Sequence, residues 1–155
     1  AVLGYVVSVS QLESATRQLA LYGASVPDLL PFRSAETYGK VFEEMPSAAC
    51  ALYLRTLWTW DLLFPISYGL GLYVLIRQDL GSWELVPLTA ALADLCENLL
   101  ATAILNGSQV VSTAYAMVSA TKWILLSIAV LGVLASLMRV VVVGMRRLQT
   151  RTPPP

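Results

Sequence analysis

Five polar residues occur inside segments that are otherwise apolar, and their side chains are the ones in this chain best suited to chemistry. They are Asp61, Asp94, Glu97, Asn98 and Lys122. An ionisable group in hydrocarbon costs about 2.5 to 3.5 kcal/mol on insertion scales, so each charge needs a partner. Asp94, Glu97 and Asn98 are spaced i, i+3, i+4 and share one helix face. The pattern predicts an intramembrane polar core, which either binds a ligand or only fixes the packing of the helices.

The depth of each residue follows from the helical rise and from the orientation argued below. We expect Asp61 about 8 Å below the outer boundary of the bilayer, at 1.5 Å per residue. On the same scale Glu97 and Asn98 lie about 10 to 12 Å below that boundary, and Lys122 about 12 Å below it. Asp94 is expected deeper, near the midplane. Antiparallel neighbouring helices would thus bring all of these residues except Asp94 to one level.

The charges of this polar core do not balance, because three carboxylates face one lysine. Either at least one carboxyl is protonated, or Arg55 reaches down from the membrane boundary to join the cluster. Trp60 and Tyr68 are further candidates to line a ligand site. Trp123 is expected to belong to the interfacial belt, with the other aromatic residues near the span ends.

The rest of the sequence offers no second site for catalysis or metal binding. Histidine is absent, which removes the commonest metal ligand and the commonest neutral-pH acid or base. Cys50 and Cys96 are too few for a disulfide framework or a zinc site. The sequence contains no Gly-rich phosphate loop and no Ser/His/Asp set. We therefore expect no catalytic residue, no metal and no cofactor.

The composition places these residues in a membrane protein. Hydrophobic residues make up 57% of the 155-residue chain and charged residues 13%, with a mean hydropathy of +0.67. A soluble domain is about one quarter charged, because polar groups must cover its surface. The net charge of zero gives no indication of a nucleic-acid partner. The partners that we expect are membrane lipids and other membrane-protein subunits.

Long apolar runs predict an all-α, polytopic transmembrane bundle of four helices. A stretch of about 20 apolar residues crosses roughly 30 Å of hydrocarbon as a helix, which satisfies its own backbone hydrogen bonds. The expected spans are a partial first one at about 1–22, with its start upstream of Ala1, and full ones at about 56–76, 85–105 and 114–138. We expect one domain over 1–148 and a disordered tail over 149–155.

Local signals refine these elements. Pro65 is expected to kink the 56–76 helix, and Gly69 and Gly71 to allow close approach of a neighbouring helix. The first loop is expected to be ordered, with short helices on the bilayer surface. In it, 26–32 forms an extended turn, Ser34 caps a helix over 35–45, and Ser47 caps the helix that enters the membrane.

The basic residues predict the orientation. Arg139, Arg146, Arg147 and Arg151 gather near the C-terminus, and Arg77 lies in a short loop. The loop 106–113 contains no lysine or arginine. The positive-inside rule therefore places the C-terminus and the Arg77 loop in the cytoplasm.

Three motifs carry a resemblance to known proteins. They are Asp61-Leu62-Leu63-Phe64-Pro65, Asp94-Leu95-Cys96-Glu97-Asn98 and Thr121-Lys122-Trp123. Together they resemble a group of small bacterial four-helix integral membrane proteins that have no assigned activity. The resemblance implies four helices with a shared polar core, a first helix that begins upstream, and a location in the bacterial inner (plasma) membrane. It does not imply an activity.

Two functions of different classes remain open. The small size, the lack of a catalytic set and the small residues on apolar faces favour a non-catalytic accessory, scaffold or assembly subunit of a larger membrane complex. The alternative is a protein, including an enzyme, that binds a lipid or small hydrophobic ligand at the intramembrane carboxylates and lysine. A proton path is less favoured, because no acidic residue continues from the midplane to the cytoplasmic side.

Overall fold

The regular structure of this chain is helical throughout the part that the computed structural model describes, residues 2–29, 31–77 and 81–149. The long helices are α1 (Val2–Leu21), α4 (Trp60–Ile76), α5 (Val86–Leu105) and α6 (Ser112–Gln149). The shorter elements are η1 (Pro27–Leu29), α2 (Ala35–Glu43), α3 (Ser47–Leu57), η2 (Gly81–Leu85) and η3 (Gln109–Val111). The predicted all-α class is confirmed.

Three helical segments in the described residues are long and apolar enough to cross a membrane. They are Ser47–Ile76, Trp83–Leu105 and Ser112–Val142. These segments contain the three full spans expected from the sequence. The helix α1 covers most of the expected partial span but is not one of the three segments. The structure therefore supports a helical bundle with three candidate membrane spans, whereas the fourth span stays a prediction.

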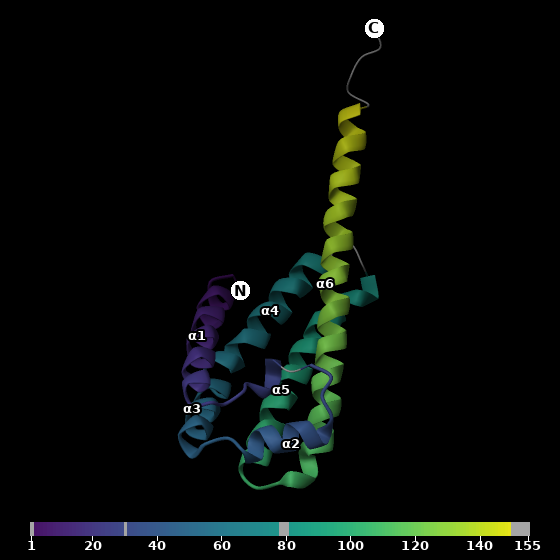
Figure 1. The fold of residues 1–155 in the computed structure, drawn as a ribbon. Helices are drawn as coiled ribbons and strands as arrows, with labels where there is room; N and C mark the ends of the chain where they lie inside the picture. Colours follow the sequence, from purple (N-terminus) through teal and green to yellow (C-terminus); the bar gives the residue numbers. More distant parts are fainter. Residues whose placement is uncertain (1, 30, 78–80, 150–155) are drawn as a thin grey trace.

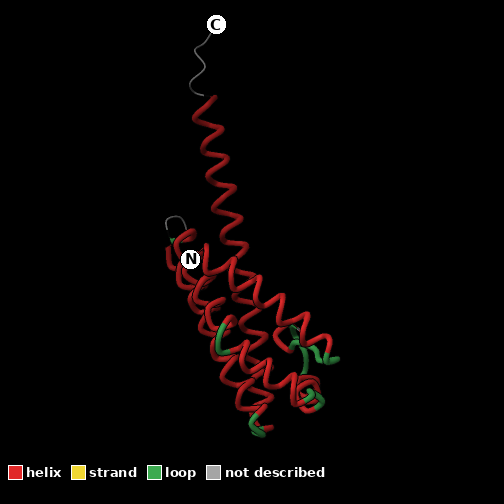
Figure 2. The backbone as a smooth tube through the Cα atoms, turned by 90° about the vertical axis from the view of Figure 1, so that its left-hand side faces the viewer, coloured by secondary structure: helices red, strands yellow, loops and turns green. Residues whose placement is uncertain are grey.

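The long helices pack as neighbours in an antiparallel arrangement (Figure 1). The helix α4 packs against α1 and α5, and α5 packs against α6. The short helix α2 lies across one end of the bundle, where Tyr38 and Phe42 are buried. The helix α6 continues far beyond the other helices (Figures 1 and 2). The expected tail lies outside the described residues, except for Gln149 at the end of α6.

The helical segment that contains Pro65 is interrupted earlier in the chain, and the kink at Pro65 stays a prediction. The segment Ser47–Ile76 divides into α3 and α4 at Trp58 and Thr59, where Thr59 has φ −119° and ψ −85°. Pro65 lies inside α4, which continues through it. The interruption ends where α4 begins, one residue before Asp61, so this carboxylate lies in the first turn of α4.

The two predicted helix caps have different outcomes. Ser34 is the N-cap of α2, because its Oγ accepts a hydrogen bond from the Thr37 backbone N–H at 3.2 Å. The prediction for Ser47 was wrong: Pro46 is the N-cap of α3, Ser47 is the first helical residue, and no side-chain cap bond forms. Proline is well suited to a helix start, since no intrahelical acceptor exists there for an N–H.

Candidate intramembrane polar site

Lys122 on α6 is the centre of a buried ionic cluster. Its ammonium lies 3.1 Å from Oδ1 of Asp94 and also forms an ion pair with Oε2 of Glu97. The residues Lys122, Asp94 and Glu97 are 5%, 5% and 0% exposed. Since Asp94 and Glu97 are one helical turn apart on α5, both carboxylates reach the same cation on the neighbouring helix. The structure thus joins α5 and α6 by buried charges.

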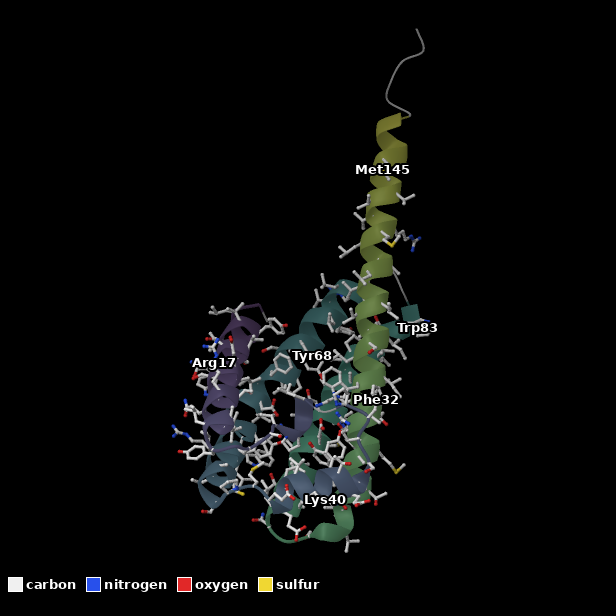
Figure 3. The ribbon with its side chains drawn as sticks, in the orientation of Figure 1. Arg17, Phe32, Lys40, Tyr68, Trp83 and Met145 are labelled. Carbon is white, nitrogen blue, oxygen red and sulfur yellow. The ribbon has the colours of Figure 1, made fainter. Side chains whose placement is uncertain are left out.

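Tyr68 extends the cluster to a third helix. Its hydroxyl donates a hydrogen bond of 3.1 Å to Oδ2 of Asp94. The two oxygens of Asp94 are therefore engaged from opposite sides, by Lys122 on α6 and by Tyr68 on α4. Figure 3 shows Tyr68 in the interior of the bundle, between α4 and α6. Of the two expected lining residues, neither Tyr68 nor the half-buried Trp60 lines the cavity beside the cluster, but Tyr68 contacts the polar core through Asp94.

Asp94, which is expected deeper in the membrane than the other polar residues, contacts Lys122 directly. A lysine side chain is long enough to bridge a difference of about one helical turn along the helix axes. Asn98 is 1% exposed, and its amide nitrogen and oxygen have no hydrogen-bond partner among the described residues. Arg55, which was a candidate to join the cluster, is exposed.

A cavity of about 400 Å³ lies beside this cluster. Apolar residues form most of its wall, contributed by α1, α3, α4 and α6; they include Val9, Leu12, Leu19, Leu57, Phe64 and Leu126. Asp61, Asp94 and Lys122 also line it. Small-molecule sites in proteins are typically apolar concavities of about 300 to 1,000 Å³ with a few placed polar groups. The cavity has this character.

Asp61 joins the site through the cavity. It is 8% exposed and lies on α4, facing the same space as Asp94 and Lys122. The residues that the sequence predicted as a polar core therefore divide into three positions. Asp94, Glu97 and Lys122 form the ionic cluster, Asp61 shares their cavity, and Asn98 is buried on the α5 face near them.

Trp123 is a site residue that sequence reasoning missed. It was expected in the interfacial belt, but it lines the cavity. Its indole nitrogen is buried and has no hydrogen-bond partner among the described residues. The Lys122 ammonium lies 5.7 Å from the centre of its ring. Helix spacing gives no signal for this pair, because consecutive residues of a helix do not face the same direction.

Comparison with protein-family models, with curated proteins and with solved structures gave no match. The resemblance carried by the three sequence motifs therefore stays a prediction.

The arrangement determines which ligands the site favours. Carboxylates accept hydrogen bonds, whereas the Trp123 indole donates one. Lys122 carries one positive charge and contacts two carboxylates. A polar group that enters the cavity therefore meets more acceptors than donors. Within the described residues, no group of three or more histidine, cysteine, aspartate or glutamate side chains is placed to hold a metal ion.

Proposed function

We propose that this chain is an integral membrane protein that binds an amphipathic molecule inside its helical bundle. The apolar part of the molecule occupies the cavity, and its polar end meets Asp61, Asp94 and Lys122. The observation that carries this proposal is the cavity of about 400 Å³ whose apolar walls end at a buried ionic cluster. Sequence alone favoured an accessory subunit. The cavity favours ligand binding over an accessory role, because it leaves room for a ligand beside the polar residues.

The polar end of the ligand should donate hydrogen bonds. Asp61 and Asp94 offer carboxyl oxygens to the cavity, and the Glu97 carboxyl pairs with Lys122 behind them. A hydroxyl group suits the site best, since it donates to a carboxylate and also accepts from the buried Trp123 N–H. A protonated amine suits the carboxylates alone. A carboxylate or phosphate head would be repelled, because only Lys122 could balance its charge.

An accessory or assembly subunit is the second candidate, and the surface of α6 favours it. Large apolar side chains along its C-terminal part are exposed, among them Leu131, Leu134, Leu137, Met138, Val141 and Met145. Lipid chains cover such a surface in a bilayer, and so would a helix of another membrane subunit. This candidate assigns the ionic cluster a structural role only.

The orientation and the membrane are also proposals. The C-terminus and the end of the bundle near Arg77 lie in the cytoplasm, as the distribution of basic residues favours. The end that carries α2 then faces outward. The bacterial inner membrane is the location that the motif resemblance supports.

One purification distinguishes the two candidate functions. The chain is isolated from membranes in a mild detergent, and the same sample is analysed by proteomics and by mass spectrometry of extracted small molecules. We expect one hydroxyl- or amine-bearing amphipathic compound, enriched well above its share of the bulk lipid. A stoichiometric set of other membrane subunits, with only bulk phospholipid extracted, would establish the accessory role instead.

Two pairs of variants make the result specific. Ala15→Phe adds a ring to a buried residue of the cavity wall and should abolish the enrichment. Ala135→Phe adds the same ring to an exposed position on α6 and should leave it unchanged. Asp61→Asn should weaken retention, whereas Glu36→Gln, at an exposed residue of α2, should not. Equal retention in all four variants would show that the compound binds elsewhere.

A further inference from the structure

The cavity has a neighbour of similar size. A second concavity of about 360 Å³ is lined by Tyr5 of α1, by several α4 residues from Phe64 to Leu75, and by Leu126 and Val130 of α6. It continues from the first in the direction in which α4 and α6 run. Phe64 and Leu126 line both spaces. The two spaces therefore meet at these two side chains.

Phe64 has a defined place at this junction. Its ring stacks on Tyr5 with centroids 5.6 Å apart and an interplanar angle of 28°. It also meets Tyr68 edge to face, at 5.2 Å and 64°. Tyr68 is the residue whose hydroxyl donates to Asp94. A row of three aromatic rings, on α1 and α4, thus stands where the two spaces meet.

The second space is the more open of the two. Leu75 and Val130, which line it, are 55% and 45% exposed, and in a bilayer such surface faces lipid. The first space contains the charged residues. To reach the second space, an apolar chain that has its polar end at Asp61 and Asp94 would have to pass the Phe64 ring. Beyond the ring it would run along the groove between α4 and α6.

We propose that the Phe64 side chain limits the length of the apolar chain that the site accepts. This inference rests on the proposed function. With the ring in place, the chain of a ligand does not extend from the first space into the second. Replacement by alanine removes the ring, joins the two spaces and nearly doubles the volume available to the chain. Phe64 is thus a specificity-determining residue, and it does not contact the polar end of the ligand.

Tryptophan quenching tests this proposal. A background with Trp58, Trp60 and Trp83 replaced by phenylalanine retains Trp123, which lines the first cavity. The reporter is 2-bromooctan-1-ol, whose bromine lies next to its hydroxyl and quenches Trp123 when bound. Unbrominated octan-1-ol and hexadecan-1-ol compete with it in the same detergent. In the background protein, octanol should displace the reporter at a lower concentration than hexadecanol does, when both concentrations are expressed per volume of micelle.

In Phe64→Ala, hexadecanol should become a stronger competitor relative to octanol, and the ratio of their competition constants should change by about tenfold or more. This factor corresponds to burying about two further methylene groups. Leu63→Ala removes a neighbouring exposed side chain and should keep the background ratio. Phe64→Leu keeps most of the packing at this position and should give an intermediate ratio, which tests the proposal even if the alanine variant does not fold.

The outcomes distinguish the role of Phe64 from the proposed ligand-binding function. A ratio in the Phe64 variants equal to that of Leu63→Ala would overturn the role of Phe64 and leave the proposed function intact. No saturable quenching of Trp123 in any protein, including the background, would overturn the proposed function and this inference together.

Discussion

Lys122 balances two buried carboxylates at once, and this makes it the residue on which the polar core depends. Replacing it by methionine would leave Asp94 and Glu97 buried beside an apolar chain. Removing one partner of a buried ion pair typically costs about 3 to 5 kcal/mol. We therefore expect Lys122→Met to lower the free energy of unfolding by about that amount, measured by denaturation in detergent.

A charge-free version of the core separates loss of packing from loss of charge balance. Adding Asp94→Asn and Glu97→Gln to Lys122→Met should recover most of the lost stability, because no uncompensated charge then stays buried. Lys40→Met is the matched control. Lys40 pairs with Glu36 at 2.8 Å, but its side chain is 64% exposed, so the change should cost at most about 1 kcal/mol. Equal losses for Lys40→Met and Lys122→Met would contradict a central role for the buried lysine.

Helix α4 approaches α5 closely at one of its two glycines and not at the other. A Cβ atom added to Gly69 would lie 2.7 Å from Cβ of Ala91 and 3.4 Å from the carbonyl oxygen of Pro87. A Cβ atom added to Gly71 meets nothing within 4 Å. The expectation of a close helix contact is therefore confirmed for Gly69 and wrong for Gly71. The residues at this contact bring Tyr68 toward its acceptor on α5.

Gly69→Ala should destabilise the protein by about 1 to 3 kcal/mol, because the two helices must separate to admit the methyl group. Gly71→Ala is the control, and it should be neutral or slightly stabilising, since alanine is the better helix former. The exchange variant Gly69→Ala with Ala91→Gly places the methyl group on the other helix and should restore most of the stability. Thermal unfolding of the four proteins in one detergent measures these differences. A loss in Gly71→Ala as large as in Gly69→Ala would refute a specific contact at Gly69.

The elements were more predictable from sequence than the site. Apolar length alone located the three span-length segments, and the side-chain cap at Ser34 has a local signature that holds in the structure. The spacing of Asp94 and Glu97 on α5 predicted a shared face, and both contact Lys122. The helix interruption at Thr59 has no comparable signal. The cavity could not be predicted at all, because α1, α3, α4 and α6 build it together and Trp123 enters it from a position typical of a belt residue.

The whole molecule is longer along α6 than a bilayer is thick. Its 38 residues correspond to about 57 Å at 1.5 Å per residue, against about 30 Å of hydrocarbon. The helix α2, at one end of the bundle, has an exposed ion pair between Glu36 and Lys40, and α1 has an exposed pair between Glu13 and Arg17. Exposed charges of this kind belong to water or to the interface. We therefore expect the first turns of α6 near that interface, the segment 114–138 across the hydrocarbon, and the remaining C-terminal turns beyond its far side. Glu13 also lines the cavity, so we expect the polar site close to the interfacial end of the bundle.

This placement predicts which residues water-borne reagents reach from each side. Cys50 and Cys96 are replaced by serine, and single cysteines are introduced by Ser108→Cys and Trp83→Cys, at exposed positions beyond opposite ends of α5. Neither change alters a charge that determines topology. A membrane-impermeant maleimide should label the first variant in intact spheroplasts and the second only after permeabilisation. Labelling of both from outside would mean that Trp83–Leu105 does not cross the membrane. The reverse pattern would keep the spans but invert the molecule, so that the cavity would open near the cytoplasmic interface and draw its ligand from the inner leaflet.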